Sequence, residues 1–371
     1  MNKQEFLSVL EQGLAALREE DRCQALDYYA EMIEDGVESG TPEETVVAGL
    51  DTPENISAQL CEEYADPRQS ARTEHPMPDE LREYCPAGSV HTVVVDARHV
   101  RVQLRHSADG RVRVWFAPRR GEQISAQEAE GVFRFVHKPV LFGPGRLFGI
   151  VIDRRELLLE VPRGFSGAIC AKTSNSGIRA EDVALGGKVQ LVTGNSGIRV
   201  EHGVFETLQC KTSNAGITLL DTNAQKCEAA TSNSKITAQR CVLDSCVCKT
   251  SNASILLEDL EGGCCEAVTD NARIAAERCR LARRLWLTTS NGPIHVDAVA
   301  APDLSLLTCN GAIKGTLLGA EEDYAVSSRT SNAKSNLRGA RPQNAPNSLR
   351  AVTSNGRIQL EFRPLPPEGE A

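Results

Sequence analysis

"KTSNSGI" at residues 172–178 is the first of ten related turns, and these copies decide the fold. It is followed by VTGNSGI (192–198), KTSNAGI (211–217), ATSNSKI (230–236), KTSNASI (249–255), VTDNARI (268–274), TTSNGPI (288–294), LTCNGAI (307–313), RTSNAKS (329–335) and VTSNGRI (352–358). The asparagines follow one another at steps of 19 to 23 residues. A period this regular indicates one structural unit per step, stacked on its neighbours.

The residues around each asparagine show which unit repeats. Apolar residues stand six and four positions before it, as Ile169 and Ala171 do before Asn175, and mixed polar residues alternate with them. Alternation with a period of two is typical of a strand. Three positions after nine of the ten asparagines, isoleucine returns at the opposite parity, so the chain must bend between them. Each repeat therefore predicts two short strands around a corner, which make one rung of a β-solenoid.

The repeated asparagines are the candidate site residues, and we interpret them as a scaffold. They share the inward parity of the apolar columns, so we expect buried side chains that hydrogen-bond from rung to rung in a structural ladder. Ten rungs at ~4.8 Å make a rod of roughly 45 Å. The predicted ladder consists of Asn175, Asn195, Asn214, Asn233, Asn252, Asn271, Asn291, Asn310, Asn332 and Asn355.

Composition agrees with a mostly β chain that has a narrow core. Only 4% of the 371 residues are aromatic, and 19 residues of extended chain close a loop of roughly 60 Å, which suits small side chains. Alternating strands in residues 89–168 predict irregular first rungs and a cap over the open edge of the solenoid. The repeats should occupy 169–362, with a polar linker at 67–88, including a short helical turn at 78–84, and a tail at 363–371.

Residues 1–66 read as a small helical bundle that carries a strong negative charge. They contain 17 acidic and three basic residues, whereas the whole chain has a net charge of −9. Phe6, Leu10 and Leu14 share one helical face, and Leu26 to Val37 repeat the pattern in a second helix. "TPEE" (41–44) and "TPEN" (52–55) each predict a threonine N-cap with proline at the first helical position.

Two family resemblances add to this prediction. "FLSVLEQGLAAL", "YYAEMIEDGVESG" and "TPEETVVAGLDTPENISAQL" resemble the HAAS-type helical domain of Gram-positive bacteria, except that Asp51 replaces the more usual glycine. That resemblance implies a role beside PadR-type regulators or membrane proteins. "VVVDARHVRVQL" through "LLLEVPRGFSGAICAKTSNSGI" resembles the bacterial putative-adhesin domain of unknown function, which implies a single-stranded, right-handed β-helix over about residues 89–362.

Catalytic, cofactor-binding and metal-ligating constellations are not evident in the sequence. Cys227, Cys246 and Cys265 should stack on successive rungs, but parallel thiols do not make a tetrahedral zinc site, and Cβ atoms ~4.8 Å apart are too distant for a disulfide. We interpret them as small buried hydrophobes. The seven histidines have no metal or triad spacing. The basic run "RCRLARR" (278–284) is either a solvated turn or a site for phosphate or an acidic partner.

These features favour a non-catalytic interaction protein without cofactors. Thirteen cysteines and the absence of a visible signal peptide or membrane span suggest reduced thiols in the cytoplasm, peripheral to the membrane only through a partner. The acidic helical bundle of residues 1–66, the head of the chain, should bind a protein and not nucleic acid. The candidate partners are a PadR-type regulator and a membrane protein. Two alternatives remain open: an envelope-associated adhesin and a carbohydrate-active enzyme on a β-helix.

Overall fold

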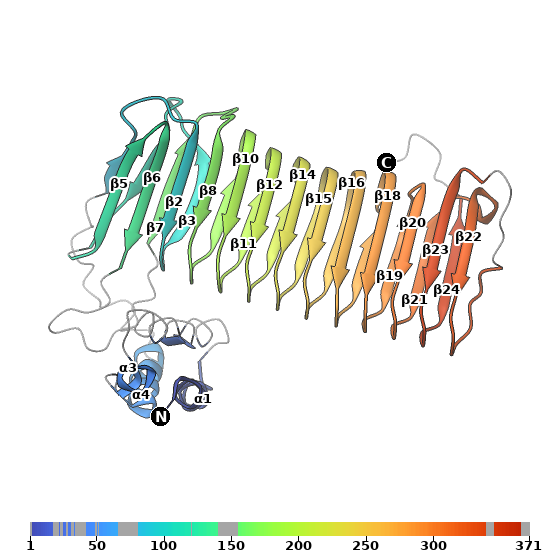
Figure 1. Ribbon diagram of the computed structural model, residues 1–371, viewed down its shortest axis with the longest axis horizontal. Helices are drawn as coiled ribbons and strands as arrows, with labels where there is room; N and C mark the ends of the chain where they lie inside the picture. The colour runs from blue at the N-terminus through green and yellow to red at the C-terminus, as the bar shows by residue number, and fades with distance from the viewer. Residues whose placement is uncertain are drawn as a thin grey trace.

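The computed structural model is dominated by one long coil of parallel strands (Figure 1). It describes residues 2–17, 22, 25–26, 29–30, 33, 42–48, 50, 52–65, 81–119, 121–139, 155–338 and 345–364. The expected fold class is confirmed: a β-solenoid of about nine turns with rungs of ~20 residues, together with a small N-terminal helical region.

The helical region has a core of its own. Its described helices are α1 (Lys3–Gly13), α3 (Glu43–Ala48) and α4 (Pro53–Ala65). Asn2 and Glu5 close a capping box at the start of α1, and Thr52 accepts a hydrogen bond from the Asn55 N–H at the start of α4, as the "TPEN" motif predicts. Thr41 lies outside the described residues. The buried cluster consists of Phe6, Leu10, Leu14, Ala25, Tyr29, Ile33, Val47 and Ile56.

Each rung places one strand before the asparagine turn and one after it. The strands before the turn are β8 (Ala168–Lys172), β10 (Ala184–Val192), β12 (Val204–Lys211), β14 (Asn223–Ala230), β18 (Arg280–Thr289), β20 (Asp303–Leu307), β22 (Tyr324–Arg329) and β23 (Asn347–Val352). The strands after it are β9 (Ile178–Glu181), β11 (Ile198–Glu201), β13 (Ile217–Leu220), β17 (Ile274–Glu277), β19 (Ile294–Val299), β21 (Ile313–Leu318) and β24 (Ile358–Arg363). β15 (Ile236–Lys249) and β16 (Ile255–Thr269) run on from one rung into the next.

The sequence period fixes the register of this stack. Ile198 pairs with Ile178 on one side and with Ile217 on the other, and the same parallel pairing continues along the coil. These isoleucines and the apolar columns before each turn are buried in one continuous core. Small and aliphatic side chains fill the narrow interior, while aromatic rings gather near its two ends, as Phe116 with Phe135 and Tyr324 with Phe362 illustrate.

At the N-terminal end, the spatial order of the rungs departs from their order in the sequence. β2 (Thr92–Ala97) and β3 (Arg101–His106) form the first rung, yet they lie in the second layer. β6 (Val132–Lys138) and β7 (Glu156–Val161) pair with their outer side, and β8 and β9 pair with their inner side. The chain therefore adds an outer layer first and then crosses back to build the rest of the coil.

The same exchange occurs at the C-terminal end. β23 pairs with β20 on one side and with β22 on the other, so a strand that comes later in the sequence lies inside an earlier one. β24 likewise pairs with β21. The outermost rung is therefore the one that contains β22 and Asn332, and the last rung of the sequence is interior.

Antiparallel strands close the N-terminal edge. β5 (Gln123–Ala129) pairs with β6, β4 (Arg113–Phe116) pairs with β7, and β1 (Arg82–Tyr84) pairs with β4. β1 falls inside the predicted linker, and the helical turn expected at 78–84 is wrong at residues 82–84, which complete this antiparallel edge. Residues 66–80, which make up most of that linker, lie outside the described residues.

Candidate functional site

The repeated asparagines form a continuous hydrogen-bonded ladder. Asn233 donates from Nδ2 to Asn214 Oδ1 over 2.7 Å and accepts from Asn252 Nδ2 over 2.7 Å. At the start of the asparagine column, Asn175 Nδ2 lies 3.2 Å from Nδ1 of His99, which occupies the equivalent position in the rung of β2 and β3. All ten predicted ladder residues take part in this column.

The exchanged rungs reorder the end of the ladder. Asn355 donates to Asn310, and Asn332 donates to Asn355. Every amide group donates in the same direction along the axis, so the side-chain dipoles add along the column. Asn332 is the last member in space, although Asn355 is the last in the sequence.

The expectation that the asparagine side chains are buried is wrong. Asn233 is exposed, and most of the column lies at the surface. The strand parity ends at the turn, and the buried polar group is the threonine two positions earlier. Thr250, for example, is 5% exposed, and its hydroxyl donates to the Ser234 carbonyl of the neighbouring rung over 3.2 Å. A buried threonine ladder and an exposed asparagine ladder thus lie side by side at this corner.

A second ladder occupies the opposite end of the strands that follow the turns. Seven positions after each of seven asparagines, one residue adopts a left-handed backbone with φ between 47° and 53°. Non-glycine residues rarely adopt this conformation, so the corner geometry is strongly specified by the coil. These residues are Asp182, His202, Asp221, Arg240, Asp259, Arg278 and Ala298.

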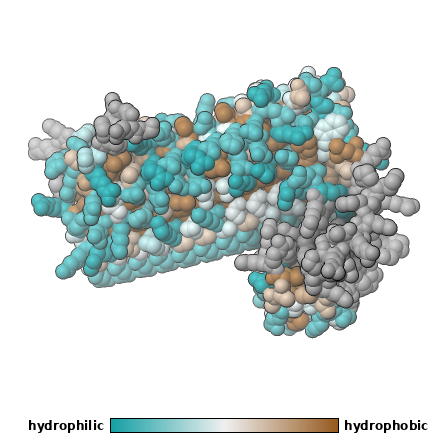
Figure 2. All heavy atoms as spheres, turned by 180° about the vertical axis from the view of Figure 1, so that it is seen from behind, coloured by the Kyte–Doolittle hydropathy of each residue, from teal (hydrophilic) through white to brown (hydrophobic). Residues whose placement is uncertain are grey.

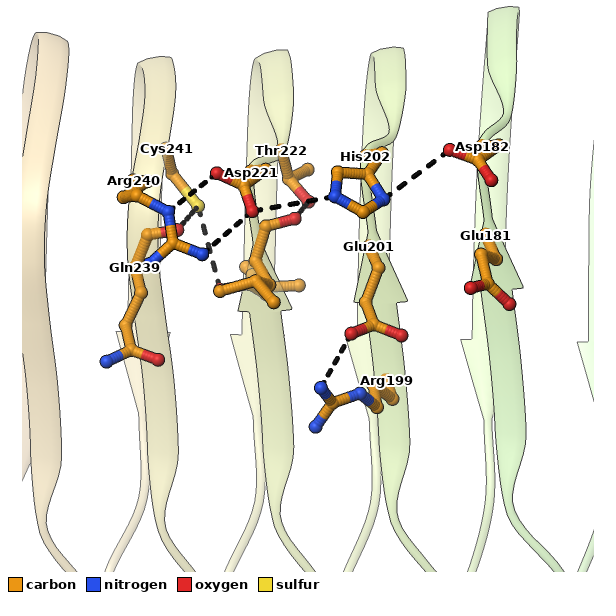
Figure 3. A network of polar contacts seen from close by, with 12 residues as sticks. Glu181, Asp182, Arg199, Glu201, His202, Asp221, Thr222, Gln239, Arg240 and Cys241 are labelled. Atoms are coloured by element: carbon orange, nitrogen blue, oxygen red, sulfur yellow. Dashed lines mark hydrogen bonds and ion pairs between the residues drawn. The ribbon is translucent and has the colours of Figure 1, made fainter.

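In this corner, aspartates alternate with histidine or arginine from rung to rung (Figure 3). His202 lies between Asp182 and Asp221, with N–O distances of 3.4 and 3.7 Å. Arg240 then donates through two nitrogens to Asp221 over 2.8 and 2.9 Å. This hydrogen-bonded pair lowers the pKa of Asp221 and raises that of Arg240. This ladder was not predicted from the sequence, because a residue at a fixed offset from each asparagine does not by itself indicate a left-handed backbone.

Asp259 and Arg278, the remaining two charged corner residues, continue the pattern. The nearby Glu201 carboxylate makes two ion pairs. Arg278 donates to Asp259, which lowers the pKa of that carboxyl. In the strand before the corner, Glu201 is held by Arg199 and by Arg179, which lowers its pKa to about 2. The charged groups of this face therefore satisfy one another.

The cysteine column is buried in the core as a set of thiols. Cys246 pairs in register with Cys227 and with Cys265, as the sequence predicts, and the three are at most 3% exposed. All twelve cysteines that the structure describes are free. Burial raises the pKa of Cys241 to about 11 and that of Cys279 to about 12, so neither is a thiolate at neutral pH.

The N-terminal cap contains a buried polar cluster outside the repeats. Glu122 accepts two hydrogen bonds from Arg155, and its Oε2 lies 3.5 Å from Nε2 of His137, which is 1% exposed. Although burial opposes ionisation, contacts with His137 and Arg155 hold the pKa of Glu122 well below its usual range. The arrangement ties β6 to the start of β7, and its apolar neighbour is the Phe116 ring, 4.9 Å from the His137 ring.

Three of the four arginines of the basic run 278–284 make ion pairs within the solenoid. Arg283 pairs with Asp244 over 2.7 Å, and Arg284 lies 3.7 Å from Asp303 with its guanidinium 4.2 Å from the Trp286 ring. Trp286 is 38% exposed, and its indole N–H donates to Asp303. The interpretation of this run as a turn is wrong from Arg280 onward, because Arg280, Arg283 and Arg284 lie in strand β18.

Across the described residues, the polar groups form ladders and pairs and do not converge on one cleft. No group of three or more His, Cys, Asp or Glu in the described part of the chain is arranged to hold a metal ion. Among the described helices, none is long and apolar enough to cross a membrane. The face seen in Figure 2 intersperses hydrophilic and hydrophobic residues along the solenoid.

Comparisons with known proteins identify the head more clearly than the coil. Residues 5–59 match the family model described as HAAS, which confirms the resemblance of the head. No curated protein matches the chain. Among solved structures, the chain is similar to a putative cell adhesion protein from Clostridium sporogenes, with 5% identity and a TM-score of 0.18 over 76% of this chain and 100% of that one.

Proposed function

We propose that this chain, with a HAAS domain at its N-terminus, is a non-catalytic interaction protein. In this proposal the acidic head docks a protein partner, and the solenoid is a rigid spacer that holds the head at a defined position. A PadR-type regulator or a membrane protein is the candidate partner that the HAAS resemblance implies. The place of action is the cytoplasm, where the free thiols would stay reduced.

The observation that carries the proposal is the contrast between the charges of the two parts. On the solenoid, exposed arginines such as Arg240 and Arg278 already have carboxylate partners. On the head, Glu11, Glu44 and Glu54 are exposed. They make no ion pair within the described part of the chain. Unpaired negative charges at a surface attract a basic partner and speed its approach.

The test uses the full chain and three substitutions in the head. Glu11→Gln, Glu44→Gln and Glu54→Gln remove negative charge at exposed positions without touching the buried cluster. Candidate partners are first identified by crosslinking in native cells, then purified, and their association is measured by stopped-flow kinetics. We expect the triple variant to associate several-fold more slowly at low salt, and the difference to shrink as salt is added.

A matched control makes the same chemical change on the solenoid. Glu206 and Glu261 are also exposed, and Glu206→Gln with Glu261→Gln should leave the association rate unchanged. If the head variant and this control associate at the same rate at low salt, charge on the head does not guide docking. If a chain without residues 1–66 captures the same partner as the full chain, the docking role of the head is wrong.

A further inference from the structure

Three rungs near the C-terminal end have a glycine directly after the ladder asparagine. These Asn-Gly pairs are Asn291 with Gly292, Asn310 with Gly311, and Asn355 with Gly356. They are spread over the sequence, yet they are successive members of the ladder, because Asn310 donates to Asn291 and Asn355 donates to Asn310. The exchanged order of the terminal rungs thus places the three pairs side by side.

An asparagine followed by glycine is prone to deamidation, since glycine has no side chain to shield its backbone nitrogen. That nitrogen attacks Cγ of the asparagine, its proton passes to a base in the solvent, and the bond from Cγ to Nδ2 breaks to release ammonia. Water then opens the five-membered imide to give aspartate or isoaspartate. One water is consumed and one ammonia is released, so no other reactant is needed.

In the coil, the attacking nitrogen of each pair is both buried and hydrogen-bonded. The three glycines are buried, and their N–H groups donate to the hydroxyl of the threonine three positions earlier over 3.2, 3.1 and 3.0 Å. These threonines are Thr289, Thr308 and Thr353, each at most 5% exposed. Each hydroxyl also donates to a neighbouring rung, as Thr308 does to the Gly292 carbonyl over 3.0 Å. An N–H held in such a chain and shielded from water is not available for deprotonation.

The bond from glycine to threonine marks these three rungs. In the other rungs of the ladder, serine or alanine follows the asparagine, and among the described residues none of them makes this bond. Glycine is required here, because a Cβ at Gly311 would collide with the Gly292 carbonyl oxygen, and one at Gly356 would collide with that of Gly311. Close stacking therefore creates the labile pairs, and the threonines offset that lability.

We propose that Asn291, Asn310 and Asn355 are deamidation sites that the folded coil keeps intact, with the threonine hydroxyls as the protecting groups. The side-chain amides are restrained as well, because Asn310 donates to Asn291 over 2.8 Å and accepts from Asn355 over 2.6 Å. Deamidation then requires a rung to open, and its rate falls in proportion to the fraction of time that the rung is open.

The loss of one asparagine weakens the protection of its neighbours. A carboxylate at position 310 can only accept, so it faces Oδ1 of Asn291 without a donor between them. Isoaspartate also adds a methylene to the backbone of a rung whose strand β20 pairs in register with β18 and β23. Because the three pairs are adjacent, we expect one deamidation to promote the next.

The experiment follows deamidation of the full chain at pH 8 by peptide mass spectrometry and compares it with synthetic peptides of the three turns. We expect each folded site to react at least tenfold more slowly than its peptide, which corresponds to about 1.4 kcal/mol of protection. Thr308→Val removes the accepting oxygen and should speed deamidation of Asn310 several-fold, whereas Thr308→Ser keeps the hydroxyl and should leave it slow. Folded sites that react as fast as the peptides, or a Thr308→Val chain that reacts at the original rate, would overturn the proposal.

A matched control separates the hydroxyl from a general loosening of the rung. Leu306→Ala removes a buried side chain from the same rung and leaves Thr308 in place. Hydrogen exchange measures how often the rung opens in each variant, so the deamidation rates can be compared at equal opening. If Leu306→Ala and Thr308→Val then deamidate Asn310 at the same rate, the threonine has no protecting role.

The spread from rung to rung has its own control. Asn310→Asp should speed deamidation of Asn291 and Asn355, because it cuts the ladder between them. Asn214→Asp makes the same change several rungs away, at an asparagine that alanine follows, and should leave both rates as they are. Equal rates in the two variants would refute the coupling between neighbouring pairs.

Discussion

Replacing single members of the asparagine ladder by alanine tests both the ladder and the exchanged order of the last rungs. Asn233 and Asn355 each make two side-chain hydrogen bonds to neighbouring asparagines, whereas Asn332 makes one. Sequence order would make Asn355 the last rung and Asn355→Ala the mildest change. The structure predicts instead that Asn355→Ala resembles Asn233→Ala, and that Asn332→Ala is the mildest.

The size of the effect follows from the exposure of the column. A typical hydrogen bond contributes about 0.5–1.5 kcal/mol net, and a partner left unpaired at the surface is hydrated by water. The lower half of that range applies, so losing two bonds should cost about 1–2 kcal/mol and losing one about half as much. A buried ladder would cost more, because the unpaired amide could not reach water.

Hydrogen exchange followed by mass spectrometry is the suitable assay, because a solenoid can open locally without unfolding as a whole. A loss of 1 kcal/mol corresponds to exchange about fivefold faster in the affected rung. We expect this acceleration around Asn355 in Asn355→Ala and a smaller one around Asn332 in Asn332→Ala. If Asn332→Ala destabilises its rung more than Asn355→Ala does, the order of rungs described above is refuted.

Three further predictions concern the core, the charges and the corner. Exposed Cys309 should react with iodoacetamide within minutes at pH 8, whereas buried Cys246 should react only after denaturant is added, as peptide mass spectrometry would show. The pKa of Glu201 is about 2, below its usual 4.5, so its ion pairs stabilise the fold above pH 4.5 and are lost as the pH falls toward 2. Glu201→Gln should therefore lessen the fall in melting temperature across that window. Ala298 has φ 53°, so Ala298→Gly should stabilise the chain by up to about 1 kcal/mol in urea unfolding, while Ala276→Gly, in a buried strand, should destabilise it.

The regular part of the fold could be predicted because each repeat carries the same information. A period of 19 or 20 residues with apolar columns at fixed offsets specifies a parallel register, and the buried positions of Ile217, Ile236 and their equivalents follow from it. The inward threonines were also predictable, since they continue the strand parity. The asparagine side chains were wrongly predicted to be buried, because the alternation of inward and outward residues along a strand does not continue across a bend such as 250–255.

Two features could not be predicted from a pattern of this kind. Rungs with equal registers can stack on one another in any order, so nothing in the repeat shows that β23 lies between β20 and β22. The corner ladder requires a residue with a left-handed backbone in each rung. An aspartate or arginine in the sequence does not indicate a left-handed backbone. Asp221 and Arg240 become partners only because the coil brings every nineteenth residue into contact.

The exchanged order of the terminal rungs makes the ends of this coil resist fraying. In a simple solenoid the terminal rung can peel away, and the next can follow, so that the rod frays from its ends. Here a pull on the C-terminus acts on β23 and β24, which are held between neighbours and cannot leave before β22 has been displaced. Synthesis of the chain meets the same constraint, because β22 has no strand to join until residues 347–352 have been made. The outermost rung therefore locks into place only when the rest of the coil is complete.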